Sequence, residues 1–221
     1  MKVQCPPQFR KCAVYGRAGK RVKMGNEALC YTRVHTSVAA RYMISHQYKC
    51  IFIHQRKCAG SSIIATFGFD VNDREWHFMN EGVLSPEYES APPYFRFAVV
   101  RNPWDRFVSA WKYLDTTRGL SLRDVLTHLP PDGKEYRHLT RPQHTTLCDS
   151  NGHLIVDYLI RFESLQQDFD QVCQIIGKPA RKLPHVNKGN RKPYSDYFDE
   201  ECRRLFMNQF ARDVELLGYQ Y

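Results

Sequence analysis

The sequence predicts an α/β fold in which helices flank a central, mostly parallel sheet. Apolar stretches of strand length occur at 50–53, 94–100 and 155–162. A helical pattern follows each of them, and strands that alternate with helices are typical of a parallel sheet. Because ligands of such sheets bind at the carboxyl ends of the strands, the segments that follow the strands are the first places to look for a site.

The first half of the chain begins with a basic, mixed segment over 1–30. Apolar residues at helical spacing predict a helix over 31–45. The apolar run at 50–53 predicts a short buried strand, and the hydroxyl residues that open 61–67 are typical of the start of a helix. The polar, proline-containing segment 68–93 predicts a loop with a short helix.

The second half begins with the clearest strand, over 94–100. Asn102 suits an N-cap and Pro103 suits the first helical position, so a helix is expected from Pro103 to residue 114. Within 115–153 we expect one helix, over 122–129, and a long polar loop. A third strand over 155–162 and helices over 165–176 and 198–217 follow, and a loop over 177–197 separates the two helices.

The charge balance favours an anionic partner. Lys and Arg number 32 against 23 Asp and Glu, which gives a formal net charge of +9. Such a surplus suits nucleic acid, a nucleotide, a sulfated or phosphorylated substrate or an acidic membrane face, and a merely basic protein remains an alternative. No apolar stretch approaches the roughly 20 residues that span a bilayer, so no membrane-spanning helix is expected.

The eight cysteines favour free thiols. Residues 1–10 carry no apolar signal segment, so we expect a reducing, cytoplasmic compartment rather than four disulfides. A Golgi-lumen location would require an N-terminal anchor beyond this sequence. No C-x-x-C or H-E-x-x-H spacing occurs, so no metal site is expected.

The segment 53–62 has the composition of an anion-binding turn at a helix N-terminus. Gly60 lets the backbone approach a ligand, Ser61 and Ser62 add hydroxyl donors, and Lys57 adds a full charge. The patterns G-x-x-x-x-G-K-[ST] and G-x-G-x-x-G are both absent. A basic turn that merely starts a helix therefore remains an alternative.

The segment 100–109 repeats this arrangement. Arg101 stands at the end of a strand and offers a fork of donors that fits phosphate oxygens, and Ser109 lies about two turns into the following helix. Alternatively, Arg101 pairs with Asp105 across the helix start. Two such units in one small sheet indicate a ligand with two separate anionic ends.

These two segments resemble the cofactor loops of a known enzyme family. The chain reads F-I-H-Q-R-K-C-A-G-S-S at 52–62 and V-R-N-P-W-D-R-F-V-S at 100–109. Both are similar to the loops of sulfotransferases that use 3′-phosphoadenosine 5′-phosphosulfate (PAPS), in particular the carbohydrate, heparan/chondroitin-type branch called family 2. The similarity continues at 160–169, 183–187 and 213–219.

The resemblance implies a P-loop-like, three-layer α/β fold. It implies a sulfotransferase domain over 45–221. The residues before it, 1–44, form a basic N-terminal segment in which the apolar spacing predicts a helix. Two departures concern the first loop, where Arg56 replaces a frequent proline and Cys58 a frequent threonine. We expect Cys58 to be a small buried thiol that meets phosphate through its backbone N–H, and not a nucleophile.

The resemblance also implies which residues hold the cofactor. Residues 57–62 would bind the 5′-phosphosulfate, and Arg101 with Ser109 the 3′-phosphate. Lys188 and Arg191, in a late basic loop, would add to the 3′-phosphate site, although a solvated charge run remains an alternative. The full expected set is Arg56, Lys57, Cys58, Ala59, Gly60, Ser61, Ser62, Arg101, Ser109, Lys188 and Arg191.

For catalysis, the resemblance implies that Lys57 neutralises the leaving phosphate oxygen. His77 lies between the two cofactor loops, where the family commonly carries a catalytic histidine, and is the expected base for the acceptor. A surface histidine in a polar loop is the alternative. His54 follows a strand directly and is expected to be structural, and His144 is a further candidate to touch the acceptor.

The function expected from the sequence is in-line transfer of a sulfuryl group from PAPS to a hydroxyl or amine, with a carbohydrate as the acceptor. The partner is then a small molecule or a glycan, with no nucleic acid and no membrane span. Two alternatives stay open at this point. One is an ATP-dependent P-loop-type kinase or phosphotransferase, and the other is a non-catalytic protein that binds polyanions.

Overall fold

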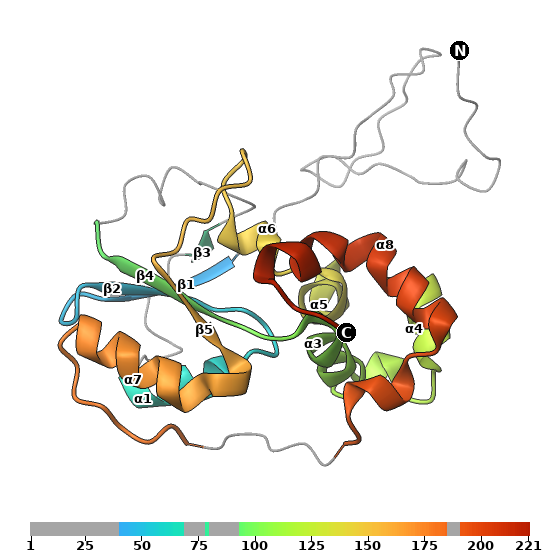
Figure 1. Cartoon of the computed structure of the whole chain (residues 1–221), viewed down its shortest axis with the longest axis horizontal. Helices are drawn as coiled ribbons and strands as arrows, with labels where there is room; N and C mark the ends of the chain where they lie inside the picture. Colours follow the sequence, from blue (N-terminus) through green and yellow to red (C-terminus); the bar gives the residue numbers. More distant parts are fainter. Residues whose placement is uncertain (1–39, 69–77, 80–92, 185–190) are drawn as a thin grey trace, which may run out of the picture. The chain divides into compact units, whose positions relative to one another are not determined.

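A computed structural model describes residues 40–68, 78–79, 93–184 and 191–221. Its sheet has the strand order β3-β1-β2-β4-β5 (Figure 1). The neighbours β2, β4 and β5 are parallel, whereas β1 is antiparallel to both β2 and β3. The α/β class is thus confirmed, with an antiparallel edge added to the parallel part. The strands are β1 (Ala40–Ser45), β2 (Cys50–Ile53), β3 (Phe78–Met79), β4 (Phe95–Val100) and β5 (Tyr158–Arg161).

The helices follow the strands in the predicted alternation. Short 3₁₀ or π turns, labelled η, occur between several of them. The α-helices are α1 (Gly60–Phe67), α3 (Pro103–Trp111), α4 (Leu122–Thr127), α5 (Gly133–Glu135), α6 (His144–Leu147), α7 (Leu165–Ile175) and α8 (Glu200–Leu217). The other turns are η2 (Asp115–Thr117), η3 (Tyr136–Thr140), η4 (Phe162–Ser164) and η5 (Tyr194–Tyr197).

Helices cover both faces of the central strands, which gives three layers. Phe52 and Phe97 point to the face that α1 and α7 cover, and these two helices lie together on one side of the sheet (Figure 1). Ile51 and Ala98 point to the opposite face, where α6 and the end of α8 pack. Strands buried on both faces are apolar throughout, which explains the continuous apolar runs in the sequence.

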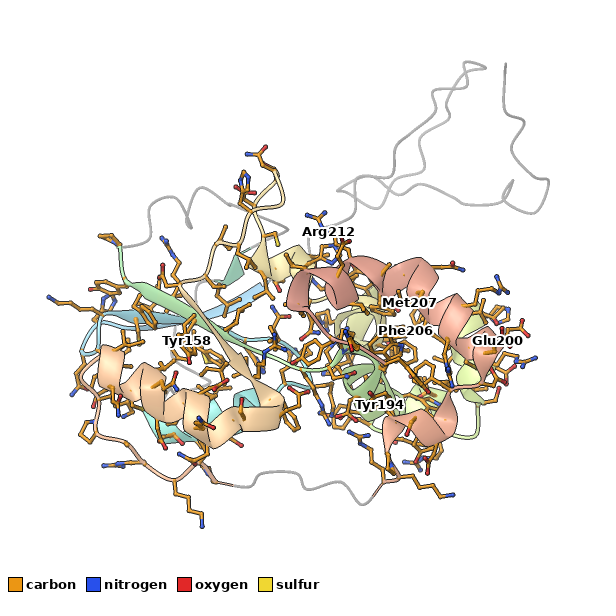
Figure 2. The ribbon with its side chains drawn as sticks, in the orientation of Figure 1. Tyr158, Tyr194, Glu200, Phe206, Met207 and Arg212 are labelled. Atoms are coloured by element: carbon orange, nitrogen blue, oxygen red, sulfur yellow. The ribbon has the colours of Figure 1, made fainter. Side chains whose placement is uncertain are left out.

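A second, aromatic core joins α3, α4 and α8. Phe206 and Phe210 stack with ring centroids 4.5 Å apart, and Phe107 meets Phe206 edge-on at 5.7 Å. Trp104 stacks on Phe206, with ring centroids 5.4 Å apart, and on Tyr194, at 6.4 Å. Figure 2 labels Phe206 and Tyr194. This core fixes α3, whose first turn follows the second predicted anion loop, and therefore holds that loop in place.

The structure corrects the predicted helix over 31–45 in its described part. Residues Ala40–Ser45 form β1, which pairs with β2 in the register Ser45↔Cys50 and Ile44↔Ile51. The turn between the strands includes Lys49 at φ 48°. Pairing with a fully buried strand overrides the weak helical spacing of the local sequence. β1 spans both sides of the predicted domain boundary between 44 and 45.

Two predicted loops contain more structure than expected. The segment 115–153 holds η2, α5, η3 and α6 besides the predicted α4, and 177–197 holds η5. The third strand is shorter than predicted, because the N–H of Ile155 bonds to Leu147 O and residue Phe162 already begins η4. The two-residue strand β3 lies in the segment 68–93, where no strand was predicted.

Candidate active site

The carboxyl ends of β2 and β4 open into one cavity of about 1600 Å³. Residues from both predicted anion loops line it, together with residues from η3, the start of α7 and the segment 180–184. The cavity therefore lies where a parallel sheet places its ligands. Of the predicted site residues, those that line it are Arg56, Lys57, Ala59, Gly60, Ser61, Ser62, Arg101, Ser109 and Arg191.

Three predicted residues stand apart from this set. His77 and Lys188 lie outside the described residues, so their roles stay predictions. Cys58 is fully buried and its Sγ lies 3.5 Å from both Arg56 O and Gln143 Oε1. Burial raises the pKa of the Cys58 thiol to about 12, so the residue is a neutral packing group, in agreement with the small buried thiol expected from the sequence.

The backbone of the first loop adopts an unusual conformation. Lys57 and Ala59 have φ values of 67° and 54°, in the left-handed region that non-glycine residues rarely occupy. Each such residue costs on the order of 1–3 kcal/mol, so the rest of the structure must hold the loop in place. Ala59 precedes α1, and no side chain caps the helix there. Left-handed turns and uncapped helix starts both offer N–H groups to anions.

Gly60 is required for a reason that the sequence did not indicate. A Cβ at this position would lie 2.0 Å from Cδ2 and Nε2 of His54. The His54 ring itself packs against Phe52, with ring centroids 5.9 Å apart. Gly60 thus admits the imidazole of His54 beside the helix start. This contact agrees with the expected structural role of His54.

Lys57 carries a charge without a counter-ion in the described part of the chain. Its Nζ lies 3.6 Å from the centroid of the Tyr113 ring. Burial, followed by the positive charges of Arg101 and Arg191, lowers the pKa of Lys57 to about 8. The ammonium is therefore cationic at neutral pH but poorly solvated, which favours an incoming anion.

From the sequence, Arg101 either faces an anion or pairs with Asp105, and in the structure it both lines the cavity and pairs with Asp105. Its Nε and Nη2 lie 2.7 and 2.6 Å from Asp105 Oδ2, and its Nη1 donates to Lys57 O at 2.8 Å. The guanidinium also lies 3.9 Å from the centroid of the Phe162 ring. The ion pair with Asp105 exists, and at the same time the side chain lines the cavity and ties the second loop to the first.

Arg191, from the late basic loop, contacts the carboxylate of Asp105, which also pairs with Arg101. Its Nη2 lies 2.6 Å from Asp105 Oδ1, so one carboxylate holds the guanidinium groups of both Arg191 and Arg101. Asp105 offsets one of the two guanidinium charges, so this group of three side chains keeps a net positive charge. On the other side, Ser62 Oγ donates to Pro184 O at 2.8 Å. The buried Ser62 hydroxyl thus holds the segment that precedes the late loop.

Sequence reasoning missed the residues that hold the two loops together. The fully buried Gln143 accepts from Arg101 N through Oε1 at 3.1 Å and donates from Nε2 to Arg101 O at 2.9 Å. Its own N–H donates to the fully buried Asp213 at 2.5 Å. The contacts join positions that are 42 and 70 residues apart, and no local pattern marks them.

His144 does not belong to the cavity lining. Its Nδ1 lies 2.7 Å from Asp213 Oδ1, and its N–H donates to the same oxygen at 2.8 Å. The expectation that His144 touches the acceptor is therefore not supported by its position. Tyr113, Lys112 and His138 line the cavity instead, and none of them was singled out from the sequence.

Two features are absent from the described residues 40–68, 78–79, 93–184 and 191–221. No cluster of three or more His, Cys, Asp or Glu side chains there is arranged to ligate a metal ion. Among the helices described, none combines the length and the apolar character that crossing a membrane requires.

The fold and the cavity define an α/β protein with one large cavity at the carboxyl ends of its parallel strands. The model of the sulfotransferase family matches residues 40–220. The chain belongs to this family. An uncharacterized protein of Archaeoglobus fulgidus is 31% identical over 97 residues, which are 42% of this chain and 77% of that protein.

A solved structure is also similar in part. The crystal structure of a sulfotransferase from Alicyclobacillus acidocaldarius is 22% identical, with a TM-score of 0.35. The match covers 61% of this chain and 59% of the other, so this chain spans less than two thirds of its length.

Proposed function

We propose that the protein transfers a sulfuryl group from PAPS to a hydroxyl or amine of an acceptor, with a carbohydrate as the acceptor class. One observation carries the proposal. Lys57 and Arg101, from two loops that follow neighbouring parallel strands, line a single cavity, and a hydrogen bond of 2.8 Å joins the loops. The carbohydrate acceptor rests on the resemblance of the two loop sequences.

The residues present fit a donor with two anionic ends. Lys57, with no acidic partner described, lies in the first loop, and Arg101 and Asp105 lie in the second, where Arg191 from the late basic loop joins them. The cavity exceeds the roughly 300–1,000 Å³ that is usual for a small-molecule site, so it has room for a nucleotide and part of an acceptor. Ser109 and Lys188 complete the proposed 3′-phosphate site.

The donor supplies an activated sulfuryl group attached to a phosphate that leaves. The protein's part in such a transfer is positioning and charge stabilisation. Lys57 meets the negative charge that develops on the phosphate oxygen, and the N–H groups of residues 57–62 hold the phosphosulfate. His77 is the base that the resemblance implies, and this role stays a prediction. So do the cytoplasmic location and the absence of a nucleic-acid partner.

The first experiment measures transfer from labelled PAPS to a panel of desulfated glycans and small hydroxyl or amine acceptors. We expect Lys57→Met to lower kcat at least about 100-fold, as the loss of one charge-stabilising donor does. The melting temperature should stay unchanged. Arg204→Met is the matched control, because it removes a positive charge that is exposed on α8.

Binding of the desulfonated nucleotide separates the proposal from its alternatives. We expect a micromolar Kd for 3′-phosphoadenosine 5′-phosphate (PAP) by calorimetry. Binding of ATP that excludes this nucleotide would favour the kinase alternative. Affinity for polyanions that falls steeply with salt and survives Lys57→Met would favour the non-catalytic alternative.

A further inference from the structure

Two histidines, His54 and His138, line the cavity together with Lys57 in the described part of the chain. His138 belongs to η3, a single turn of π-helix, and only 9% of the residue is exposed. Its side chain lines the same cavity as Lys57 and stacks on the Tyr113 ring at 5.6 Å, the ring above which the Lys57 ammonium lies. Single π-helical turns often occur at functional sites. The function described so far does not use His138.

The contacts of His138 fix which ring nitrogen carries the proton. Nδ1 lies 2.9 Å from the backbone oxygen of Lys134. A carbonyl oxygen only accepts, so Nδ1 must donate and the neutral ring keeps its lone pair on Nε2. No described hydrogen bond uses Nε2. The ring therefore offers one acceptor atom, in a wall of the cavity.

The turn that carries His138 is fastened to the second anion loop. The buried Arg106, in the first half of α3, donates from Nη1 to His138 O at 3.3 Å and from Nη2 to Arg141 O at 2.7 Å. Arg106 is the second arginine of the R-N-P-W-D-R segment. Its two bonds hold the middle of the turn and the residue that follows it, which is the support that a reacting side chain needs.

The surroundings keep the ring neutral. Burial lowers the pKa of His138, and the nearby charges of Arg56 and Lys57 from the first loop and of Lys134 from α5 act in the same direction. The bond to the Lys134 carbonyl is the opposing influence. Arg106 of α3 and Tyr113, which follows α3, also contact this residue. A neutral imidazole at working pH is able to take up a proton.

Resting on the proposed function, we propose that His138 is the general base that takes the proton of the acceptor. Nε2 accepts the hydroxyl proton while the acceptor oxygen forms its bond to the sulfur of the phosphosulfate donor. The bond between sulfur and the phosphate oxygen breaks, and that oxygen keeps the electron pair and meets the charge of Lys57. The role that the resemblance implies for His77 then falls to a different histidine.

Rate measurements on His138→Gln and His77→Gln, made in parallel, test this assignment. We expect His138→Gln to lower kcat at least about 100-fold, within the range for loss of a general base, while the Kd for PAP changes less than about twofold. The exposed His153→Gln is the control for removal of a histidine. A large loss confined to His77→Gln would overturn the assignment.

Two further readouts distinguish a base from a structural residue. In the wild type, kcat should fall on the acidic side as His138 takes up a proton, and His138→Gln should lack this acidic limb. Nitrogen NMR of the ring in the wild type, without any ligand, should show the Nδ1–H form at neutral pH. The Nε2–H form would overturn the proposal even if the variant did not fold. If the wild type fails to bind PAP, the proposed function fails and the base assignment fails with it.

Discussion

At the scale of the residue, Lys57 lies in surroundings that do not stabilise its positive charge. Burial and two nearby guanidinium groups disfavour the ammonium, and its contact is the face of the Tyr113 ring. By contrast, Arg101 and Arg191 share the carboxylate of Asp105. The free energy that an anion gains at Lys57 is therefore not offset by breaking an ion pair.

This electrostatic difference predicts a pH dependence of nucleotide binding. The pKa of Lys57 is lowered to about 8 in the folded protein, so the cation is present below pH 8 and is lost as the pH rises through that value. The Kd for PAP should therefore rise above pH 8, by at most about tenfold per pH unit for one proton. Calorimetry between pH 6.5 and 9.5 measures this change.

Lys57→Met is the control for the pH series. Its weaker binding should show no such rise between pH 8 and 9.5, because the titrating amine is gone. Equal slopes for the wild type and the variant would show that another group causes the pH dependence.

At the scale of elements, the two strand–turn–helix units differ in what stabilises the start of the helix. The second helix starts at a cap that local sequence reveals, since Asn102 Oδ1 accepts from Trp104 N at 3.0 Å and Asp105 N at 3.2 Å. The first helix has no such cap. Its start depends on Gly60 and on the ring of His54, a contact that no capping rule describes.

This difference explains how much of the fold the sequence predicted. Continuous apolar runs identified β2 and β4 because both strands are buried on both faces. For Ala40–Ser45 the local sequence predicts a helix. These residues form a strand because they pair with β2, and the local pattern does not reveal that pairing. Short turns such as η3 depend on distant donors, here Arg106, and have no periodicity of their own.

Sequence-based prediction of the candidate site also fails where a residue depends on distant partners. Sequence reasoning placed Lys57 and Arg101 at one edge of the sheet, since parallel strands end together, and both line one cavity. Gln143 and Asp213 were missed because they act through burial and through partners far away along the chain. His138 was missed because its tautomer and its place in the cavity follow from tertiary contacts.

The first unit yields a prediction about Gly60→Ala. The added Cβ would meet the His54 ring at 2.0 Å, so either the ring or the start of α1 must move. We expect PAP binding to weaken at least about tenfold, because a small displacement of positioning groups has a large effect on a site. Calorimetry on the purified variant measures this loss.

The double variant His54→Ala/Gly60→Ala is the matched test of this cause. Removing the ring removes the clash, so the double variant should bind more tightly than Gly60→Ala alone. If His54→Ala gave no recovery, the Cβ would act on the backbone of the loop instead of on the ring.

At the scale of the whole molecule, a chain of buried polar contacts runs from the last helix to both loops. Asp213, on α8, accepts from the N–H groups of Gln143 and His144. The Gln143 side chain holds the backbone of Arg101 on both sides, and Arg101 bonds to Lys57 O. The position of the C-terminal helix and the geometry of the anion site are thus linked through Gln143.

The last prediction concerns Asp213→Ala, which breaks this chain at its buried end. The N–H groups of Gln143 and His144 would lose their acceptor, and each buried unsatisfied group costs about 1–3 kcal/mol, so the free energy of unfolding should fall by about 2–6 kcal/mol. Urea unfolding measures this loss, with Glu215→Ala, an exposed acid on the same helix, as the control. Because Gln143 then holds Arg101 less firmly, binding of PAP should weaken as well. A variant that unfolds like the control would show that α8 and the anion loops are independent.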